Sequence, residues 1–251
     1  MNDRKLIVKI KRISGRIRRE YFNDFIVDEQ RGMSVLALLD EIQTGQDSSI
    51  YYDGQCGCAN CGICAIKING RPKLACKTQT ADLPYEIVLE PLDFFPIVKD
   101  LAVDKSEFFN RLEQKMEAWV HRQKEFNPEK EDLMVPELAD ALYENERCVK
   151  CGICVSACAA ASFGKFIGAS GCITAHRFLQ DPRNEDLGAR QKLINILSSD
   201  DGLWGCHAIE ACDNFCPKEI PLGRQLALAR KETLKILFKE WLGLAKFWRR
   251  K

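Results

Sequence analysis

The arrangement of the cysteines constrains this chain more than any other feature of its 251 residues. There are thirteen cysteines, and all of them lie at residues 56–76 or 148–216. Dense Cys-x2-Cys runs do not suit disulfides that link distant loops, and the segment Met1–Ile10 has no long apolar run or cleavage site of a secretory signal. Structural zinc takes its ligands as two separated pairs, whereas these cysteines come in runs of three and four. The pattern therefore favours iron–sulfur clusters.

The bulk composition excludes several other classes. The 37 basic and 36 acidic residues give a net charge of +1, so no nucleic-acid partner is expected. No run of eighteen or more apolar residues occurs, which argues against a membrane span. The motif Cys-x-x-Cys-His of covalently attached haem is also absent. We expect a soluble, reduced, intracellular protein.

Two kinds of apolar periodicity divide the chain. Residues 5–12 alternate polar and apolar side chains, as a half-buried strand does, and we also expect strands at residues 20–27, 64–68 and 85–90. A helical pattern lies at 33–43, and Asn69-Gly70 predicts a hairpin turn. From about residue 106 onward the spacing of apolar residues is helical. We therefore predict an α+β protein, with a β-rich domain at residues 1–104 and a helical domain at 105–251.

The first cysteine block predicts a [2Fe–2S] cluster. The spacing Cys56-x4-Cys61-x2-Cys64, followed by Cys76, is that of plant-type ferredoxins. A loop supplies three thiolates and the return of a hairpin supplies the fourth. Only one residue separates Cys58 from Cys56, a poor spacing for a second ligand, and we interpret Cys58 as a small loop residue.

The second cysteine block predicts two further clusters. Cys148, Cys151, Cys154 and Cys158 have the x2, x2, x3 spacing of bacterial ferredoxins, in which the fourth cysteine of each run binds the other cluster. The partner run has Cys206, Cys212 and Cys216 on the same template, but Ile209 at its second position. The crossed rule then gives one cluster the ligands Cys148, Cys151, Cys154 and Cys216, which predicts [4Fe–4S]. The other cluster has the ligands Cys158, Cys206 and Cys212.

The cluster with three cysteines has two interpretations. The simpler one is [3Fe–4S], with the apolar side chain of Ile209 filling the vacant corner. The competing one is a labile [4Fe–4S] cluster with water or another oxygen ligand at that corner. Cys172 fits neither template, and a buried, unligated thiol is the simpler interpretation.

Taken together, these motifs make the chain resemble the iron–sulfur subunit of succinate dehydrogenase and fumarate reductase (respiratory complex II) over essentially its whole length. The stretches that carry the resemblance are Cys56–Cys64 with its continuation to Cys76, the bridge Pro91–Asp104, the run Cys148–Cys158, and Cys206-x5-Cys212-x3-Cys216-Pro217-Lys218. The family implies a β-grasp [2Fe–2S] domain followed by an α-helical ferredoxin domain. It implies no catalytic residue in this chain.

The resemblance also implies a role and partners. Members of the family carry electrons between the FAD of a flavoprotein subunit and a quinone at a membrane anchor of cytochrome b type, with or without haem b. The subunit lies peripherally on the cytoplasmic face of the bacterial membrane. Ubiquinone-linked members have a proline and a tryptophan pair after the last cysteine of the ferredoxin run. Here Cys158-Ala-Ala-Ala-Ser-Phe163 has neither, so the chain looks more like the menaquinone-linked fumarate reductases.

Two residues lie where the family's [3Fe–4S] cluster faces quinone, namely His207 and Ile209. For His207, a hydrogen bond to a sulfide or to the backbone is an equal alternative to quinone contact. The C-terminal residues 231–251 combine apolar positions at helical spacing with seven lysines and arginines, which predicts a basic amphipathic helix at the membrane or the anchor. Two other functions remain open: an iron–sulfur subunit of a heterodisulfide-reductase-like or glycolate-oxidase-like complex, and a zinc-stabilised interaction module.

Overall fold

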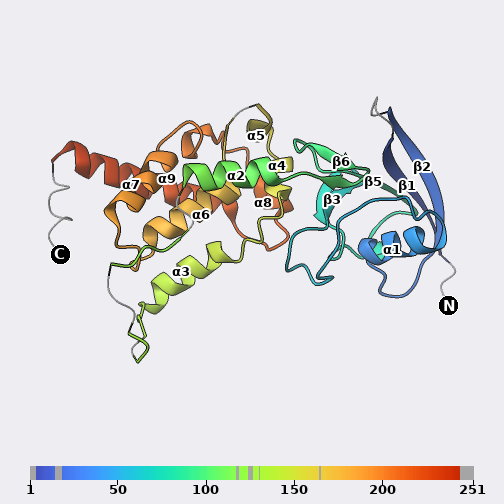
Figure 1. Ribbon diagram of the computed structural model, residues 1–251, viewed down its shortest axis with the longest axis horizontal. Helices are drawn as coiled ribbons and strands as arrows, with labels where there is room; N and C mark the ends of the chain where they lie inside the picture. Colours follow the sequence, from blue (N-terminus) through green and yellow to red (C-terminus); the bar gives the residue numbers. More distant parts are fainter. Residues whose placement is uncertain are drawn as a thin grey trace.

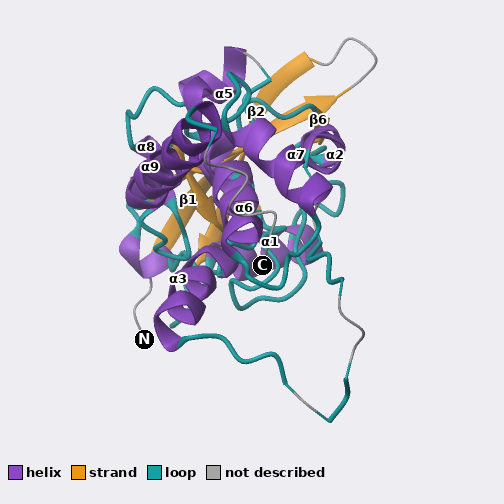
Figure 2. Cartoon of the chain, turned by 90° about the vertical axis from the view of Figure 1, so that its left-hand side faces the viewer, coloured by secondary structure: helices purple, strands orange, loops and turns teal. Residues whose placement is uncertain are grey.

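A computed structural model describes residues 4–14, 19–116, 119–123, 127–129, 131–163 and 165–243. The sheet-containing and helical halves of the chain lie end to end along the long axis of the molecule (Figure 1). Seen from the helical end, the helices lie in front of the strands (Figure 2). This arrangement confirms the predicted α+β fold, with strands first and helices second.

The N-terminal half is a mixed five-stranded sheet in the order β2-β1-β5-β3-β4. Its strands are β1 (Lys5–Ser14), β2 (Arg19–Asp28), β3 (Ala65–Ile68), β4 (Arg71–Leu74) and β5 (Glu86–Glu90). β1 pairs with β5 in parallel, whereas the β1–β2, β3–β4 and β3–β5 pairs are antiparallel. The β3–β4 turn is the expected hairpin, with φ of +50° at Asn69 and +75° at Gly70.

Helix α1 (Val35–Gly45) crosses one face of this sheet (Figure 1). Its N-terminus is capped by Ser34, whose hydroxyl accepts a hydrogen bond from Ala37 N at 3.2 Å. The buried residues of α1 recur at helical spacing and those of β1 at strand spacing, so each element presents one apolar face to the other. The buried residues are Val35, Leu38, Leu39 and Ile42 of α1, and Leu6, Val8 and Ile10 of β1.

A short strap of two strands, β6 (Ile97–Lys99) and β7 (Ala102–Val103), leads from the sheet to the helices. Its turn residue Asp100 is 1% exposed. The carboxylate accepts hydrogen bonds from Ile13 N and Tyr51 N, both at 3.1 Å. A buried carboxylate is stable only when it is paired in this way, so Asp100 fixes the strap to the first half.

The C-terminal half packs around α6 (Gly168–Gln180), of which eleven of thirteen residues are buried. The other helices are α2 (Ser106–Lys115), α3 (Pro136–Glu146), α4 (Ile153–Ser156), α5 (Ala159–Phe163), α7 (Leu187–Leu197), α8 (Ala211–Phe215) and α9 (Leu222–Trp241). Two short 3₁₀ turns, η1 (Thr80–Asp82) and η2 (Leu203–Gly205), complete the structure. His176 of α6 contacts Glu232 of α9 through Nε2 and Oε2 at 2.8 Å.

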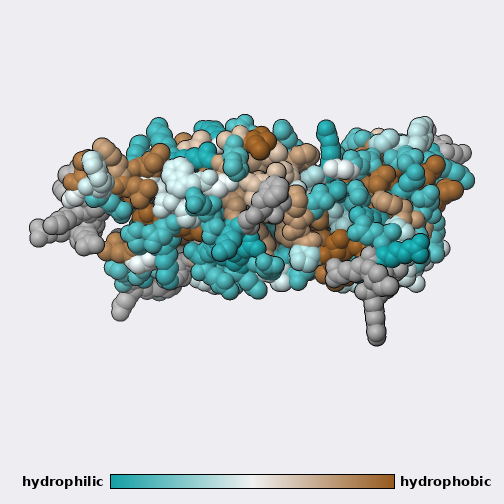
Figure 3. Space-filling view, turned by 90° about the horizontal axis from the view of Figure 1, so that it is seen from above, coloured by the Kyte–Doolittle hydropathy of each residue, from teal (hydrophilic) through white to brown (hydrophobic). Residues whose placement is uncertain are grey.

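The surface differs between the two ends of α9. Residues near its start, such as Leu226 and Ala229, are buried, whereas Phe238 and Trp241 near its end are exposed and stack on each other at 5.9 Å. Apolar surface is visible at that end of the molecule (Figure 3). Among the described residues, no helix combines the length and apolar character needed to cross a bilayer. The basic residues expected at 246–251 lie outside the described part of the chain.

Candidate metal centres

The first group contains four cysteines. Cys56, Cys61 and Cys64 lie on the loop between α1 and β3, and Cys76 follows the end of β4. Antiparallel pairing of β3 with β4 sets Ala65 opposite Leu74, so the cysteines that flank the hairpin come together. The Sγ atoms of Cys64 and Cys76 are 3.3 Å apart. Cys56 and Cys61 lie on the preceding loop. All thirteen cysteines are described, and all are free thiols.

Backbone N–H groups of this loop point at the cysteine sulfurs. Ala59 N donates to Cys76 Sγ at 3.2 Å, and Asn60 N and Cys61 N donate to Cys56 Sγ at 3.3 Å. The N–H of Cys58, which has the largest effect, and those of Asn60 and Cys61 lower the pKa of Cys56 to about 6. A loop that stabilises a thiolate suits cluster ligation, because bound sulfur carries negative charge.

Cys58 lies on the same loop but differs from its neighbours. It is the one exposed residue among the thirteen described cysteines. A hydrogen bond with Cys56 raises the pKa of Cys58, whereas the pKa of Cys56 is lowered. The environment of Cys58 therefore favours a neutral thiol that faces solvent.

A second group joins cysteines from distant parts of the sequence. Cys148, Cys151, Cys154 and Cys216 line one small pocket, whose other walls include Val149, Ile220 and Leu222. Burial, with smaller contributions from the nearby thiols of Cys148 and Cys216, raises the pKa of Cys151 to about 11. The pKa of Cys154 is also raised, first by burial and then by Cys151 and Cys148. Four cysteine sulfurs therefore line an apolar pocket, where iron binding can neutralise the negative charge of their thiolates.

The third group contains Cys158, Cys206 and Cys212. Burial, with smaller contributions from Asp213, Cys206 and Cys158, raises the pKa of Cys212 to about 12. Arg230 of α9 donates to the carbonyl oxygen of Leu203 at 2.9 Å and also bonds that of Cys206, which fixes the loop before α8. Thus Cys158 lies with the later run, and Cys216 lies with the earlier one.

No three cysteine, histidine or carboxylate side chains of the described residues meet closely enough to hold a single metal ion. A cluster does not require such an arrangement, because its cysteines are divided among two or more irons and the sulfides fill the space between them. The donor sets and the N–H groups around them fit iron–sulfur clusters.

The residues expected at the quinone end lie on the surface. Ile209 is 71% exposed, and His207 is exposed as well. The flanking residues Ala208 and Glu210 have φ of +54° and +60°, so the loop turns sharply on each side of Ile209. Ile209 therefore lies on an exposed loop between Cys206 and Cys212, and its place at the vacant corner of [3Fe–4S] stays a prediction.

Two further residues stand close to the cysteine groups. Cys172 is fully buried on α6, and burial raises its pKa, with smaller contributions from Cys206, Cys154 and Cys212. It is therefore close to cysteines of both the second and the third group. Lys105 is half-buried, and burial lowers its pKa against the opposing effect of Cys151, Asp53, Cys64 and Cys61. The sequence contained no signal for this lysine, because its neighbours come from both halves.

Family models and relatives agree with this geometry. A model described as "2Fe-2S iron-sulfur cluster binding domain" matches residues 7–110, and one described as "4Fe-4S dicluster domain" matches residues 144–220. The fumarate reductase iron-sulfur subunit of Wolinella succinogenes is 34% identical over 223 residues, which are 88% of this chain and 92% of that protein. The corresponding subunit of Mycobacterium tuberculosis is 32% identical over 231 residues, 88% of this chain and 91% of that protein.

The succinate dehydrogenase iron-sulfur subunit of Coxiella burnetii is 30% identical over 225 residues, 87% of this chain and 92% of its own length. A solved structure, "Mycobacterium smegmatis Sdh1 complex in the apo form", contains a chain with a TM-score of 0.81 at 20% identity, covering 92% of this chain and 96% of that one. This likeness shows the fold. The chain belongs to the family of iron–sulfur subunits of fumarate reductase and succinate dehydrogenase, in which it is an electron-transfer subunit.

Proposed function

We propose that this chain carries electrons between the FAD of a flavoprotein subunit and a quinone, through three clusters in line. The ligands proposed for [2Fe–2S] are Cys56, Cys61, Cys64 and Cys76. Those for [4Fe–4S] are Cys148, Cys151, Cys154 and Cys216, and those for [3Fe–4S] are Cys158, Cys206 and Cys212. When bound, the clusters supply one-electron transfer. The protein itself supplies thiolates, N–H donors and apolar walls, and we assign it no catalytic residue.

The observation that carries this proposal is the order of the three cysteine groups. Gly62 lies between Cys61 and Cys64 of the first group. It is in contact with Cys151, which belongs to the second group, and with Val149, which follows Cys148 of that group. Cys172 in turn has both Cys154 of the second group and Cys206 of the third as electrostatic neighbours. Each group therefore has the next one as its neighbour, as a relay requires.

The third group supports quinone at the far end of the relay. His207, Ile209 and Trp204 are exposed beside Cys206, so another molecule can reach this group. We propose menaquinone, because the run after Cys158 lacks the proline and tryptophan pair of the ubiquinone-linked members. His207 is the proposed polar contact, and Ile209 the proposed apolar one.

The partners follow from the two ends of the relay. We assign the flavoprotein to the sheet half and a cytochrome b-type anchor, with haem b where that anchor carries it, to the helical half. Such an assembly lies on the cytoplasmic face of the bacterial membrane, held by its anchor. No nucleic acid belongs to it.

Redox titration of the purified complex followed by low-temperature EPR tests the proposal. We expect an oxidised [3Fe–4S] signal, a reduced [2Fe–2S] signal and a reduced [4Fe–4S] signal, with iron and sulfide contents that match all three. A complex that binds zinc without sulfide would contradict the assignment. Covalent FAD with succinate oxidation in the co-purified large subunit separates this function from a heterodisulfide-reductase-like or glycolate-oxidase-like complex.

A further inference from the structure

The loop that carries Cys56, Cys61 and Cys64 touches the start of the ferredoxin run through its backbone. Gly62 has φ of +72°, and a Cβ atom placed there would lie 2.8 Å from Val149 O and 2.9 Å from Cys151 Cβ. A distance below 3.0 Å is too short for a carbon contact, so only glycine permits this approach. The two cluster loops therefore meet with no side chain between them at this point.

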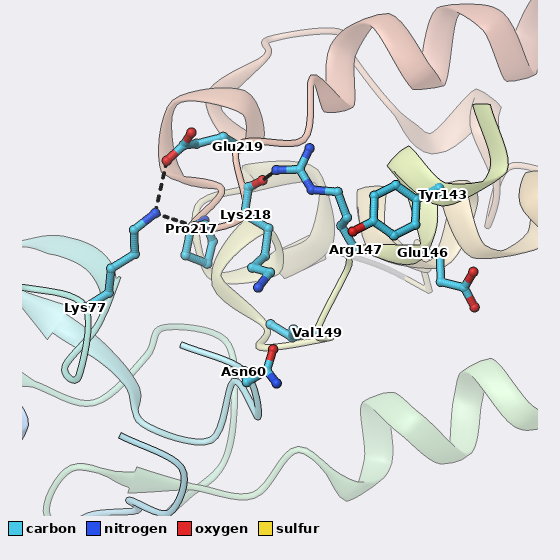
Figure 4. Close-up of a pocket in the computed structure, with 9 residues that line it drawn as sticks. All are labelled: Asn60, Lys77, Tyr143, Glu146, Arg147, Val149, Pro217, Lys218 and Glu219. Carbon is cyan, nitrogen blue, oxygen red and sulfur yellow. Dashed lines mark hydrogen bonds and ion pairs between the residues drawn. The ribbon is translucent and has the colours of Figure 1, made fainter. Parts of the chain in front are cut away.

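Next to this contact, Lys77 reaches from the sheet half to the helical half (Figure 4). Its Nζ donates to the carbonyl oxygen of Pro217 at 2.7 Å and pairs with Glu219 Oε1 at 3.0 Å. Lys77 directly follows Cys76, and Pro217 directly follows Cys216. One side chain thus joins the neighbours of two cysteines from different groups.

Lys218 makes the reciprocal connection. Its Nζ donates to the carbonyl oxygen of Ala59 at 3.4 Å, and Ala59 N donates to Cys76 Sγ at 3.2 Å. Arg147, which directly precedes Cys148, bonds the carbonyl oxygen of Lys218 and so holds that loop from the other side (Figure 4). Each loop therefore sends one lysine to the backbone of the other.

These side chains line a cavity of about 390 Å³ between the halves, together with Asn60, Tyr143 and Glu146. Apolar packing does not fill this side of the junction, so polar side chains connect the loops here. The Lys77 and Glu219 side chains are 48% and 78% exposed. Exposed ion pairs contribute only about 0–1 kcal/mol to stability, so a substitution at this pair should leave folding and cluster content largely unchanged.

We propose that Lys77 and Lys218 are positioning residues, which hold the loop of the first cysteine group at a fixed separation from the loops of the second. The inference rests on the ligand sets given under Proposed function. The rate of electron transfer falls steeply with the separation of the two clusters. The covalent connection between the two halves is the chain segment 91–105, which contains the strap. The reciprocal lysines limit rotation of one half against the other where separation matters most.

The test uses the purified complex with the variants Lys77→Met, Lys218→Met and Glu219→Gln, and with Lys5→Met as a control. Lys5 lies on β1 and is paired only loosely with Asp28, at 3.9 Å. The readouts are iron and sulfide content, the midpoint potentials, and the relaxation enhancement of the reduced [2Fe–2S] signal by reduced [4Fe–4S]. This enhancement reports the separation of the two clusters and does not require turnover.

We expect full cluster content and a weaker enhancement in Lys77→Met, Lys218→Met and Glu219→Gln, and no change in Lys5→Met. Loss of the lysine charge lowers the [2Fe–2S] potential, whereas loss of the glutamate charge raises it. Because these charge effects are opposite, a weaker enhancement in both kinds of variant would come from a changed separation of the clusters and not from the changed charge. Where Lys77→Met loses a cluster, the double variant Lys218→Met with Glu219→Gln carries the same test.

An unchanged enhancement in fully loaded variants would overturn the positioning role and leave the relay intact. Absence of the [2Fe–2S] or [4Fe–4S] signal from the unmodified complex would instead overturn the ligand sets. The two failures are thus distinguishable in one set of spectra.

Discussion

Position 209 shows how much one residue controls in this chain. Isoleucine stands where the ferredoxin template has cysteine, and its side chain is largely exposed on a loop with left-handed residues on both sides. The exposed loop lets another molecule approach the third cysteine group. It also means that a substitution at this position disturbs little packing.

We predict that Ile209→Cys supplies a fourth thiolate and converts [3Fe–4S] to [4Fe–4S]. The midpoint potential at the quinone end should fall, because cluster type and net charge set the potential. EPR of the air-oxidised complex measures this as loss of the [3Fe–4S] signal. Ile209→Ser is the control for the loop and should retain the signal. An unaltered signal in Ile209→Cys would contradict the ligand set of the third cluster.

Cys56 provides a pH-dependent prediction. Three N–H donors lower its pKa to about 6, against about 8.5 for an ordinary thiol. In protein depleted of clusters, the rate of alkylation of Cys56 should therefore rise as the pH passes 6 and be close to its maximum at pH 7. Cys58 is an internal control, because it is more exposed but has a raised pKa. Peptide mass spectrometry measures both, and faster labelling of Cys58 at pH 7 would contradict the prediction.

At the level of secondary structure, the loops between elements carry the chemistry and the elements hold their ends. The β3–β4 hairpin brings Cys64 to Cys76, and the short helices α4 and α8 place cysteines of two runs together. The glycines in these loops differ in what they do. Gly57 has φ of +65° with open space around it, whereas Gly62 touches backbone of the other half.

This difference predicts unequal effects of alanine. Gly57→Ala should cost about 1–2 kcal/mol, the usual penalty for a side chain in the left-handed region. Gly62→Ala has the same backbone penalty and also a clash with Val149 and Cys151, so its effect should be larger. The rate of loss of cluster absorbance on heating the complex compares the two variants. Equal rates in the two variants would contradict the close contact of Gly62 with Val149 and Cys151.

The sequence predicted some elements well because their signals are local. The strand at 5–12, the helix at 33–43 and the Asn69-Gly70 turn each follow from a periodicity or a turn preference of neighbouring residues. The cysteine spacing likewise predicted the family, because each run of ligands is short and continuous in sequence. The roles of Asp100, Lys77 and Lys105 had no such signal, since their partners are distant in sequence. The exposure of Ile209 had no signal either, because spacing does not report which way a loop faces.

At the level of the whole molecule, the sheet half and the end of α9 lie toward opposite ends of the long axis (Figure 1). The start of α9 is part of the core, and His176 anchors it through Glu232. Its end presents Leu234, Phe238, Trp241 and Leu242 to solvent. An apolar helix end of this kind suits contact with the anchor subunit or the membrane surface.

We therefore predict that the double variant Phe238→Ser, Trp241→Ser weakens recovery of the complex with membranes. The cysteine groups should be unaffected, because neither aromatic ring belongs to the buried core. Sedimentation of membranes, with iron content as the internal reference, measures the effect. Val98→Ser changes an exposed residue of the sheet half and should leave recovery unchanged. Full recovery of the double variant would remove this role for α9.

The exchange of cysteines between the two runs has a consequence for biogenesis. With the proposed ligands, Cys216 closes a cluster begun 68 residues earlier at Cys148, and Cys158 closes a cluster whose other ligands come later in the chain. Each cluster then acts as a cross-link over a long loop, and such cross-links restrict the unfolded chain strongly. Neither cluster can be inserted with its full set of ligands until both runs have been synthesised. Maturation of the helical half is therefore expected to be a single late event after translation.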